Sequence, residues 1–188
     1  MKKIFVVAAI SLVTLSASAQ KLARVNFTEL VQLMPEADQA RATLKAVSQE
    51  AEETLQTMYT EYQTKMQQYQ QKSASWSDVI KKSKESELMD IQRHIEENQQ
   101  AFQQEIQQKQ NELMAPIYEK AQTTVKDLAK AQGVTALFDS SSALYFDETA
   151  VIDLTADARK ALKIPADRTL EALQAELAAQ QQATATQQ

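Results

Sequence analysis

The sequence has no cysteine, and its 188 residues include a single glycine, Gly133. The missing cysteine excludes disulfide bonds, thiolate metal ligands and attachment of a lipid through a cysteine. Because glycine-rich phosphate loops and nucleophile elbows need glycine at several positions, a single glycine excludes those sites as well. Most enzyme architectures are thereby disfavoured, and we expect no catalytic residue, no bound metal and no cofactor.

Acidic side chains outnumber basic ones, and prolines number only three. Without the first 19 residues, 18 Lys and Arg stand against 25 Asp and Glu, a net charge of −7. This balance argues against a nucleic-acid-binding surface, which needs clustered positive charge. A composition rich in Gln, Ala, Glu, Lys and Leu and poor in Gly and Pro is typical of long, uninterrupted helices.

The first residues carry the pattern of a secretory signal peptide. A basic start at Lys2 and Lys3 is followed by an apolar run over residues 4–15 and by small residues up to Ala19. That run is shorter than the roughly 20 residues that a membrane-spanning helix needs. We therefore expect residues 1–19 to direct export and to be cleaved after Ala19, which leaves a chain without a membrane anchor.

A short strand is predicted at the start of the mature chain. Residues 21–27 alternate between two faces and include branched and aromatic side chains. Asn26 can cap the next helical turn, and Glu29 can complete a capping box. Pro35 cannot continue a helix but suits its first position, so we expect a long helix from about Glu36.

An apolar stripe with an eleven-residue repeat marks the stretch from residue 36 to about residue 72. Its larger apolar residues are separated by steps of three and four, and a repeat of about 3.67 residues per turn runs nearly straight along a helix. The residues of this stripe are Leu44, Val47, Ala51, Leu55, Met58, Tyr62, Met66 and Tyr69.

A second helix with the same repeat follows a serine-rich turn near residues 73–78, where Ser75 and Asp78 can form a capping box. Its apolar positions recur eleven apart at Ile80, Ile91, Phe102 and Leu113. Two matched stripes predict an antiparallel coiled-coil hairpin over residues 36–128, with helices of about 55 and 80 Å. We expect Pro116 to kink the second helix. Polar residues interrupt its seam at Lys84, Gln99 and Gln110.

After the hairpin the pattern changes to short strands. Residues 134–139, 143–147 and 150–153 are rich in branched and aromatic side chains and are bounded by Ser, Asp and Thr. We expect Thr155 to cap a short helix that ends before Pro165.

The rest of the chain, residues 165–188, is expected to be an extension of the main fold. Residues 167–179 can form a further helix, whereas residues 180–188 have nothing apolar to bury and are expected to be disordered.

The fold class that follows is mainly α, with a long antiparallel helical hairpin that protrudes from a small β-body. Residues 20–35 and 129–164 supply this body. Because a few short strands make a poor core alone, we expect oligomerisation to pool the sheets of several chains. The apolar residues expected to mediate it are Leu22, Val25, Phe27, Leu137, Phe138, Leu144 and Phe146.

Two polar groupings resemble sites but have simpler interpretations. His94 lies one helical turn from Asp90 and near Glu97, a spacing that could seat a metal, yet no cysteine or second histidine supports it. We interpret this grouping as a solvated face. Residues 139–142 contain a carboxylate and hydroxyls without a base to activate them, so we predict a turn there.

The order of these segments resembles the Skp/OmpH family of periplasmic chaperones. The resemblance lies in the secreted start, in "ARVNFTELVQLMPEADQA" before the hairpin, and in "AQGVTALFDSSSALYFDETAVIDLTADARKAL" after it. It implies a trimer whose pooled β-body carries three hairpins around a cavity. It also implies a function, which is to hold unfolded outer-membrane proteins without ATP and to prevent their aggregation. Well-known members are basic, whereas this chain is acidic, which argues against positive arms that attract acidic clients or lipid head groups.

A holdase needs apolar contact that is weak and adaptable, and the flexible thioether of methionine and the amphipathic ring of tyrosine supply it. The alternative role of the stripe is plain packing within the hairpin. Trp76 is either a contact for clients or a cap over the two helix ends. The runner-up function is an exported coiled-coil spacer or scaffold without clients, and lipid contact is expected to be peripheral only. The expected client-binding residues are Met58, Tyr62, Met66, Tyr69, Trp76, Val79 and Met89.

Overall fold

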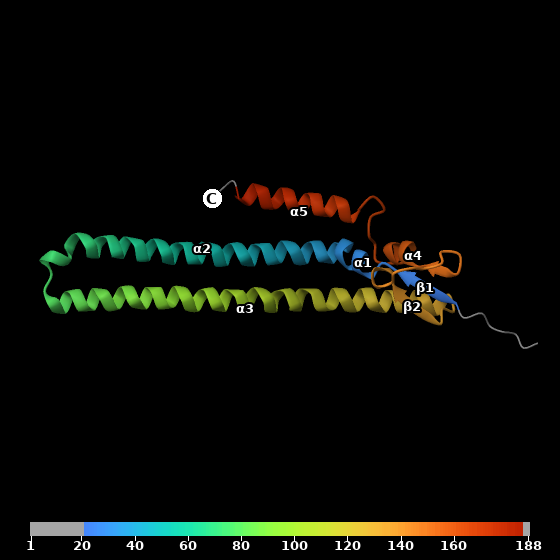
Figure 1. Ribbon diagram of the computed structural model, residues 1–188, viewed down its shortest axis with the longest axis horizontal. Helices are drawn as coiled ribbons and strands as arrows, with labels where there is room; N and C mark the ends of the chain where they lie inside the picture. The colour runs from blue at the N-terminus through green and yellow to red at the C-terminus, as the bar shows by residue number, and fades with distance from the viewer. Residues whose placement is uncertain (1–20, 186–188) are drawn as a thin grey trace, which may run out of the picture.

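The structure is a computed structural model that describes residues 21–185, so the predicted signal peptide lies outside the described residues. Its elements place a long helical hairpin on a small base (Figure 1). They are, in order, β1 (Leu22–Val25), α1 (Phe27–Leu33), α2 (Pro35–Lys72), a 3₁₀ turn (Ser73–Ser75), α3 (Asp78–Ala131), β2 (Ala136–Asp139), a second 3₁₀ turn (Ser140–Ser142), β3 (Val151–Asp153), α4 (Thr155–Ala161) and α5 (Leu170–Ala185). The predicted fold class, mainly helical with a small sheet, is confirmed.

The sheet has the strand order β2-β1-β3, and both pairings are parallel. Leu22 of β1 lies opposite Ala136 of β2 and Val151 of β3. Parallel neighbours require a crossover connection, and the whole hairpin of α2 and α3 is the crossover between β1 and β2. The central position of β1 buries Ala23 and Val25, which are 0% and 2% exposed.

The predicted strand over residues 143–147 is wrong. A 3₁₀ turn occupies Ser140–Ser142, and the next five residues have no regular structure. Leu144 and Tyr145 within them are almost fully exposed. These residues pair with neither of the outer edges of β2 and β3, so they lack the hydrogen-bonded partner that a strand needs.

The core lies at the base, where α1, the start of α2, the end of α3 and α4 converge. Leu30, Leu33 and Met34 are completely buried there, together with Leu162 at the end of α4. Truncation of one such side chain to alanine typically costs about 2–5 kcal/mol of stability. The hairpin is therefore rooted in a well-packed base.

Asn26 joins the two ends of this base through hydrogen bonds. Its Oδ1 accepts from the backbone N–H of Glu29 at 3.1 Å, so the predicted cap of α1 is confirmed. Its own backbone N–H donates to Oγ1 of Thr155 at 3.1 Å. The expectation that Thr155 caps α4 is therefore wrong: Leu154 is at the cap position, and the Thr155 hydroxyl serves the start of the chain instead.

The hairpin begins at Pro35, one residue before the predicted start, and α2 and α3 run side by side from the base to the turn (Figure 1). The cap of α3 differs from the prediction. Oγ of Ser77, not of Ser75, accepts a hydrogen bond from the backbone N–H of Ile80 at 3.4 Å, while the Ser75 hydroxyl donates to the carbonyl oxygen of Lys72. The helix α3 continues through Pro116 without interruption.

The C-terminal helix α5 starts later and ends later than predicted. It begins at Leu170 and continues to Ala185, so the disorder expected from residue 180 is wrong up to that point, and residues 186–188 lie outside the described residues. Alanine and glutamine are good helix formers, so the intrinsic helix propensity of this segment continues α5 although residues 180–183 are exposed and bury little apolar surface. Helix α5 turns back from the base along the outer side of α2 (Figure 1).

Candidate binding surface of the helical arm

The seam between α2 and α3 is thinly buried away from the base. Among the described residues of the arm beyond the base, the buried apolar side chains are those of Ala51, Leu88 and Ile95. The stripe residues Met58, Tyr62, Met66 and Tyr69 are half-buried. They therefore pack within the hairpin and also leave part of each side chain accessible, so the two roles considered for the stripe are compatible.

Polar contacts join the two helices where apolar packing is thin. Nε2 of Gln99 donates a hydrogen bond to the Tyr59 hydroxyl at 2.6 Å across the seam. Gln99 is one of the polar residues predicted to interrupt the apolar seam. In the structure it replaces apolar packing at that point with a directional hydrogen bond between the two helices. Tyr59 lies outside the predicted stripe, and the repeat gave no signal for it.

A second polar cluster lies nearer the turn. Nζ of Lys65 on α2 donates to the Glu87 carboxylate on α3, and Nζ of Lys84 donates to the same carboxylate at 2.7 Å. These two hydrogen bonds lower the pKa of Glu87 from 4.5 to about 2, and the bond from Lys65 has the larger effect. The Tyr69 hydroxyl donates to the carboxylate of Glu85, which raises the pKa of Tyr69.

The tip combines one packed aromatic residue with exposed apolar ones. The rings of Trp76 and Tyr69 meet edge to face, with centroids 5.9 Å apart, which favours the cap role for Trp76. Val79 is 81% exposed and Met89 is 64% exposed, so these two predicted binding residues are accessible. Ile80, assigned to the seam by the repeat, is also exposed, because α3 has only just begun at this point.

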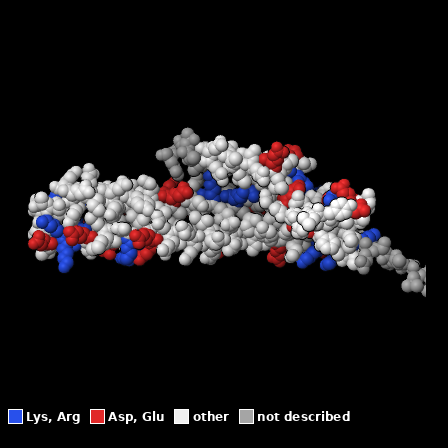
Figure 2. Space-filling model, viewed as in Figure 1, with Lys and Arg blue, Asp and Glu red and all other residues white. Residues whose placement is uncertain are grey.

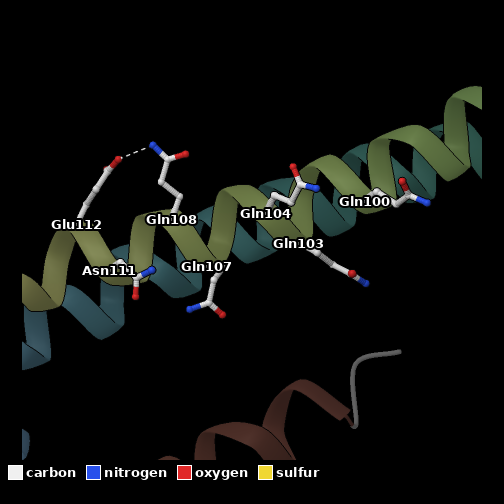
Figure 3. A pocket seen from close by; sticks show the side chains of 7 residues that line it. All are labelled: Gln100, Gln103, Gln104, Gln107, Gln108, Asn111 and Glu112. Atoms are coloured by element: carbon white, nitrogen blue, oxygen red, sulfur yellow. Dashed lines mark hydrogen bonds between the residues drawn. The ribbon is translucent and has the colours of Figure 1, made fainter.

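The outer face of α3 carries a band of uncharged amides (Figure 3). The hollow that it lines is open, and within it Nε2 of Gln108 donates a hydrogen bond to the Glu112 carboxylate at 2.8 Å. Nearer the tip, Arg93 binds both Asp90 and Glu97, at 3.1 and 3.0 Å, the two carboxylates next to His94. Both faces are therefore exposed polar surface, and the sequence interpretation of a solvated face concerned only the one around His94.

The residues predicted to mediate oligomerisation have different environments in the single chain. Val25 belongs to the chain's own core. Phe27 and Leu137 pack against that core, Leu22 is half-buried on β1, and Phe146 lies under the Arg24 guanidinium at 5.9 Å. Phe138 and Leu144 are exposed, as is Tyr145, which the prediction did not include.

Within residues 21–185, none of the helices is both long enough and apolar enough to cross a lipid bilayer.

Comparisons with known proteins agree with this architecture. The family model described as outer membrane protein (OmpH-like) matches residues 21–162. The chaperone protein Skp of Escherichia coli K12 is 30% identical over 154 residues, which cover 82% of this chain and 93% of that protein. The chaperone protein Skp of Yersinia enterocolitica is 28% identical over 148 residues, which cover 79% and 89%.

A solved structure shares the fold. The crystal structure of a protein described as an OmpH-like outer membrane chaperone, from Caulobacter crescentus CB15, superposes with a TM-score of 0.68 at 15% identity. The superposition covers 76% of this chain and 83% of that one, and at this identity it is evidence of the fold alone. Since the family model spans well over half of the sequence, the chain belongs to the OmpH-like family.

Proposed function

We propose that this protein is an ATP-independent holdase chaperone of the periplasm, which binds unfolded outer-membrane proteins and prevents their aggregation. The relatives named chaperone protein Skp support the chaperone role, and the family supports the link to outer-membrane proteins. The structural observation that carries the proposal is the arm itself, two paired helices whose apolar residues are half-buried or exposed.

The chemistry of the arm suits transient binding to many sequences. Methionine and tyrosine side chains adapt to differently shaped apolar partners, which branched aliphatic residues do less well. Half-buried residues contribute only part of their area, so each contact is weak and a bound polypeptide can leave without an energy source. The proposed client-binding residues are Met58, Tyr62, Met66, Tyr69, Val79 and Met89, with Trp76 at the tip as a supporting cap.

A trimer with three arms around a cavity is part of this proposal. The outer edges of β2 and β3 have no strand partner within the described chain. The exposed side chains of Phe138 and Leu144 lie on or just beyond β2. Pairing of such edges with those of other copies would bury them, as unpaired edges usually require. Lipid contact, where it occurs, would be peripheral.

The alternative role as a spacer without clients is not favoured. A permanent spacer gains from a continuous Leu and Ile seam. In this arm the seam instead relies on half-buried methionine and tyrosine and on polar contacts such as that of Gln99 with Tyr59. The Skp relatives are chaperones as well.

An aggregation assay tests the proposal. A urea-unfolded outer-membrane β-barrel protein is diluted into buffer without nucleotide, and light scattering is followed with and without the mature chain. We expect the chain to suppress scattering, and an equal mass of an unrelated folded protein to leave it unchanged. Persistent scattering at several-fold molar excess of the chain would favour the spacer over the chaperone.

A further inference from the structure

Helix α5 lies outside the part of the chain matched by the family model, and it forms one wall of a groove whose other wall is α2. The match to the family model ends at residue 162, whereas α5 begins at Leu170. Between α5 and the outer face of α2 is a hollow of about 1240 Å³. Figure 2 shows it as a recess beneath α5 with basic side chains along its floor.

At the base end of the groove, the start of α5 is held by core packing and by hydrogen bonds. Leu173 of α5 is 4% exposed and belongs to the main core. The Arg168 guanidinium donates to the Asp38 carboxylate of α2, and the Arg159 guanidinium donates to the carbonyl oxygens of Pro165 and Arg168. The start of α5 is therefore fixed, and the gap does not arise from a detached helix.

The lining of the groove combines apolar and charged side chains. Leu44 on α2 and Leu177 on α5 supply apolar contact from opposite walls. Lys45 on α2 and Glu176 on α5 also line the groove, and neither forms an ion pair with another described residue. Each wall therefore carries an apolar and a charged side chain next to each other, and a ligand whose apolar and polar side chains alternate along its length can contact both kinds.

Toward the tip, α2 lines a second open hollow that shares no residue with the groove. Gln56, Thr60 and Thr64 line this second hollow.

We propose that the groove between α2 and α5 binds an extended segment of an unfolded polypeptide with alternating apolar and polar side chains. This inference rests on the proposed chaperone function. Alternation is the pattern of strands in outer-membrane β-barrels, which place apolar and polar residues on opposite faces. A helix of 16 residues, such as α5, is about 24 Å long, which matches an extended segment of about seven residues. The groove thus adds a second contact for the client, beside the stripe of the arm.

Site-specific photocrosslinking tests this proposal, and the lack of native cysteine makes the labelling unambiguous. Cysteine replaces Gln181 on the α5 wall in one variant and Lys45 on the α2 wall in another, and each carries a benzophenone label. The matched control is Ala175→Cys, an exposed residue of α5 that does not line the groove. Circular dichroism checks that all three variants keep the helical content of the unsubstituted chain. Each labelled protein is mixed with a urea-diluted outer-membrane β-barrel polypeptide and irradiated.

We expect both groove positions to crosslink to the client several-fold more than position 175. Equal crosslinking at all three positions, with the client still kept soluble, would overturn the groove proposal and leave the chaperone function intact. Crosslinks between two copies of the chain in place of client adducts would also overturn it, because they would identify the groove as a subunit contact. A client that aggregates in every sample would refute the chaperone function and the groove proposal together.

Discussion

Glu87 accepts hydrogen bonds from Lys65 on α2 and Lys84 on α3, so a single carboxylate links the two helices near the tip. The Gln99–Tyr59 hydrogen bond does the same nearer the middle of the arm. These contacts are directional and surrounded by exposed residues. At the scale of residues, polar contacts therefore hold the register of the hairpin, while the apolar stripe stays partly accessible.

The low pKa of Glu87 predicts how the arm responds to acid. Because the folded pKa, about 2, lies below the ordinary 4.5, the carboxylate stabilises the hairpin above that ordinary value and loses this effect as pH falls toward 2. We expect Glu87→Gln to lower the melting temperature at pH 7 and to reduce the loss of stability between pH 5 and pH 2. Thermal melts over this range measure it, with Glu96→Gln, an exposed residue of α3, as control. Identical pH profiles of Glu87→Gln and the unsubstituted chain would show that the contact adds no stability.

Trp76 and Val79 lie close together in the sequence but are expected to differ in role. Trp76→Ala removes an edge-to-face ring contact with Tyr69, and we expect it to destabilise the hairpin by about 1 kcal/mol. Val79→Ser changes an exposed side chain, so the melting temperature should hold while client affinity falls. Urea titration and client binding by fluorescence anisotropy measure both. The opposite pattern, with Val79 needed for stability and Trp76 only for binding, would reverse the two assignments.

At the scale of elements, the repeats and breakers of the sequence were sufficient to predict the hairpin. Apolar residues eleven apart identify two matched helices, and Pro35 marks the start of the first. The strand predicted over residues 143–147 failed for a physical reason: its composition suits a strand, but pairing depends on partners that a local pattern does not contain. The order of the strands in the parallel sheet could not be predicted from the sequence either, because it depends on contacts between strands that the whole hairpin separates. For the site, the stripe was predictable from spacing, whereas Tyr59 was not, because its partner Gln99 is on the other helix.

The start of α3 gives a test at this scale. Oγ of Ser77 accepts from the backbone N–H of Ile80, whereas the Ser75 hydroxyl only donates to the carbonyl oxygen of Lys72. Since loss of an N-cap typically costs about 1 kcal/mol, we expect Ser77→Ala to destabilise the hairpin by that amount and Ser75→Ala to have little effect. Urea titration of the two variants compares them directly. A larger loss with Ser75→Ala would restore the capping box inferred from the sequence.

At the scale of the whole molecule, the base and the arm differ in how firmly they are packed. The base buries large aliphatic residues completely, whereas the arm beyond it buries few. The firmly packed base therefore anchors an arm whose seam is only thinly buried. The exposed apolar residues next to β2 add a reason for several copies to associate.

The proposed trimer predicts an effect of the exposed segment after β2. Leu144→Ser combined with Tyr145→Ser removes two exposed apolar side chains that have little contact within the single chain, so the fold of each subunit should persist. We expect sedimentation equilibrium to show a trimer for the unsubstituted chain and a shift toward monomer for the double variant. The control is Val79→Ser, an equally exposed residue at the far tip, which should remain trimeric. A double variant that is as trimeric as the unsubstituted chain would exclude this segment from the interface.

The most direct test of the central claim, that the arms hold unfolded outer-membrane proteins in solution, is sedimentation velocity of the mature chain mixed with a urea-diluted β-barrel polypeptide in the absence of nucleotide. We expect a single soluble complex that contains one client molecule and sediments faster than the chain alone. If the client pellets as aggregate while the chain sediments at its own unchanged rate, the claim is contradicted.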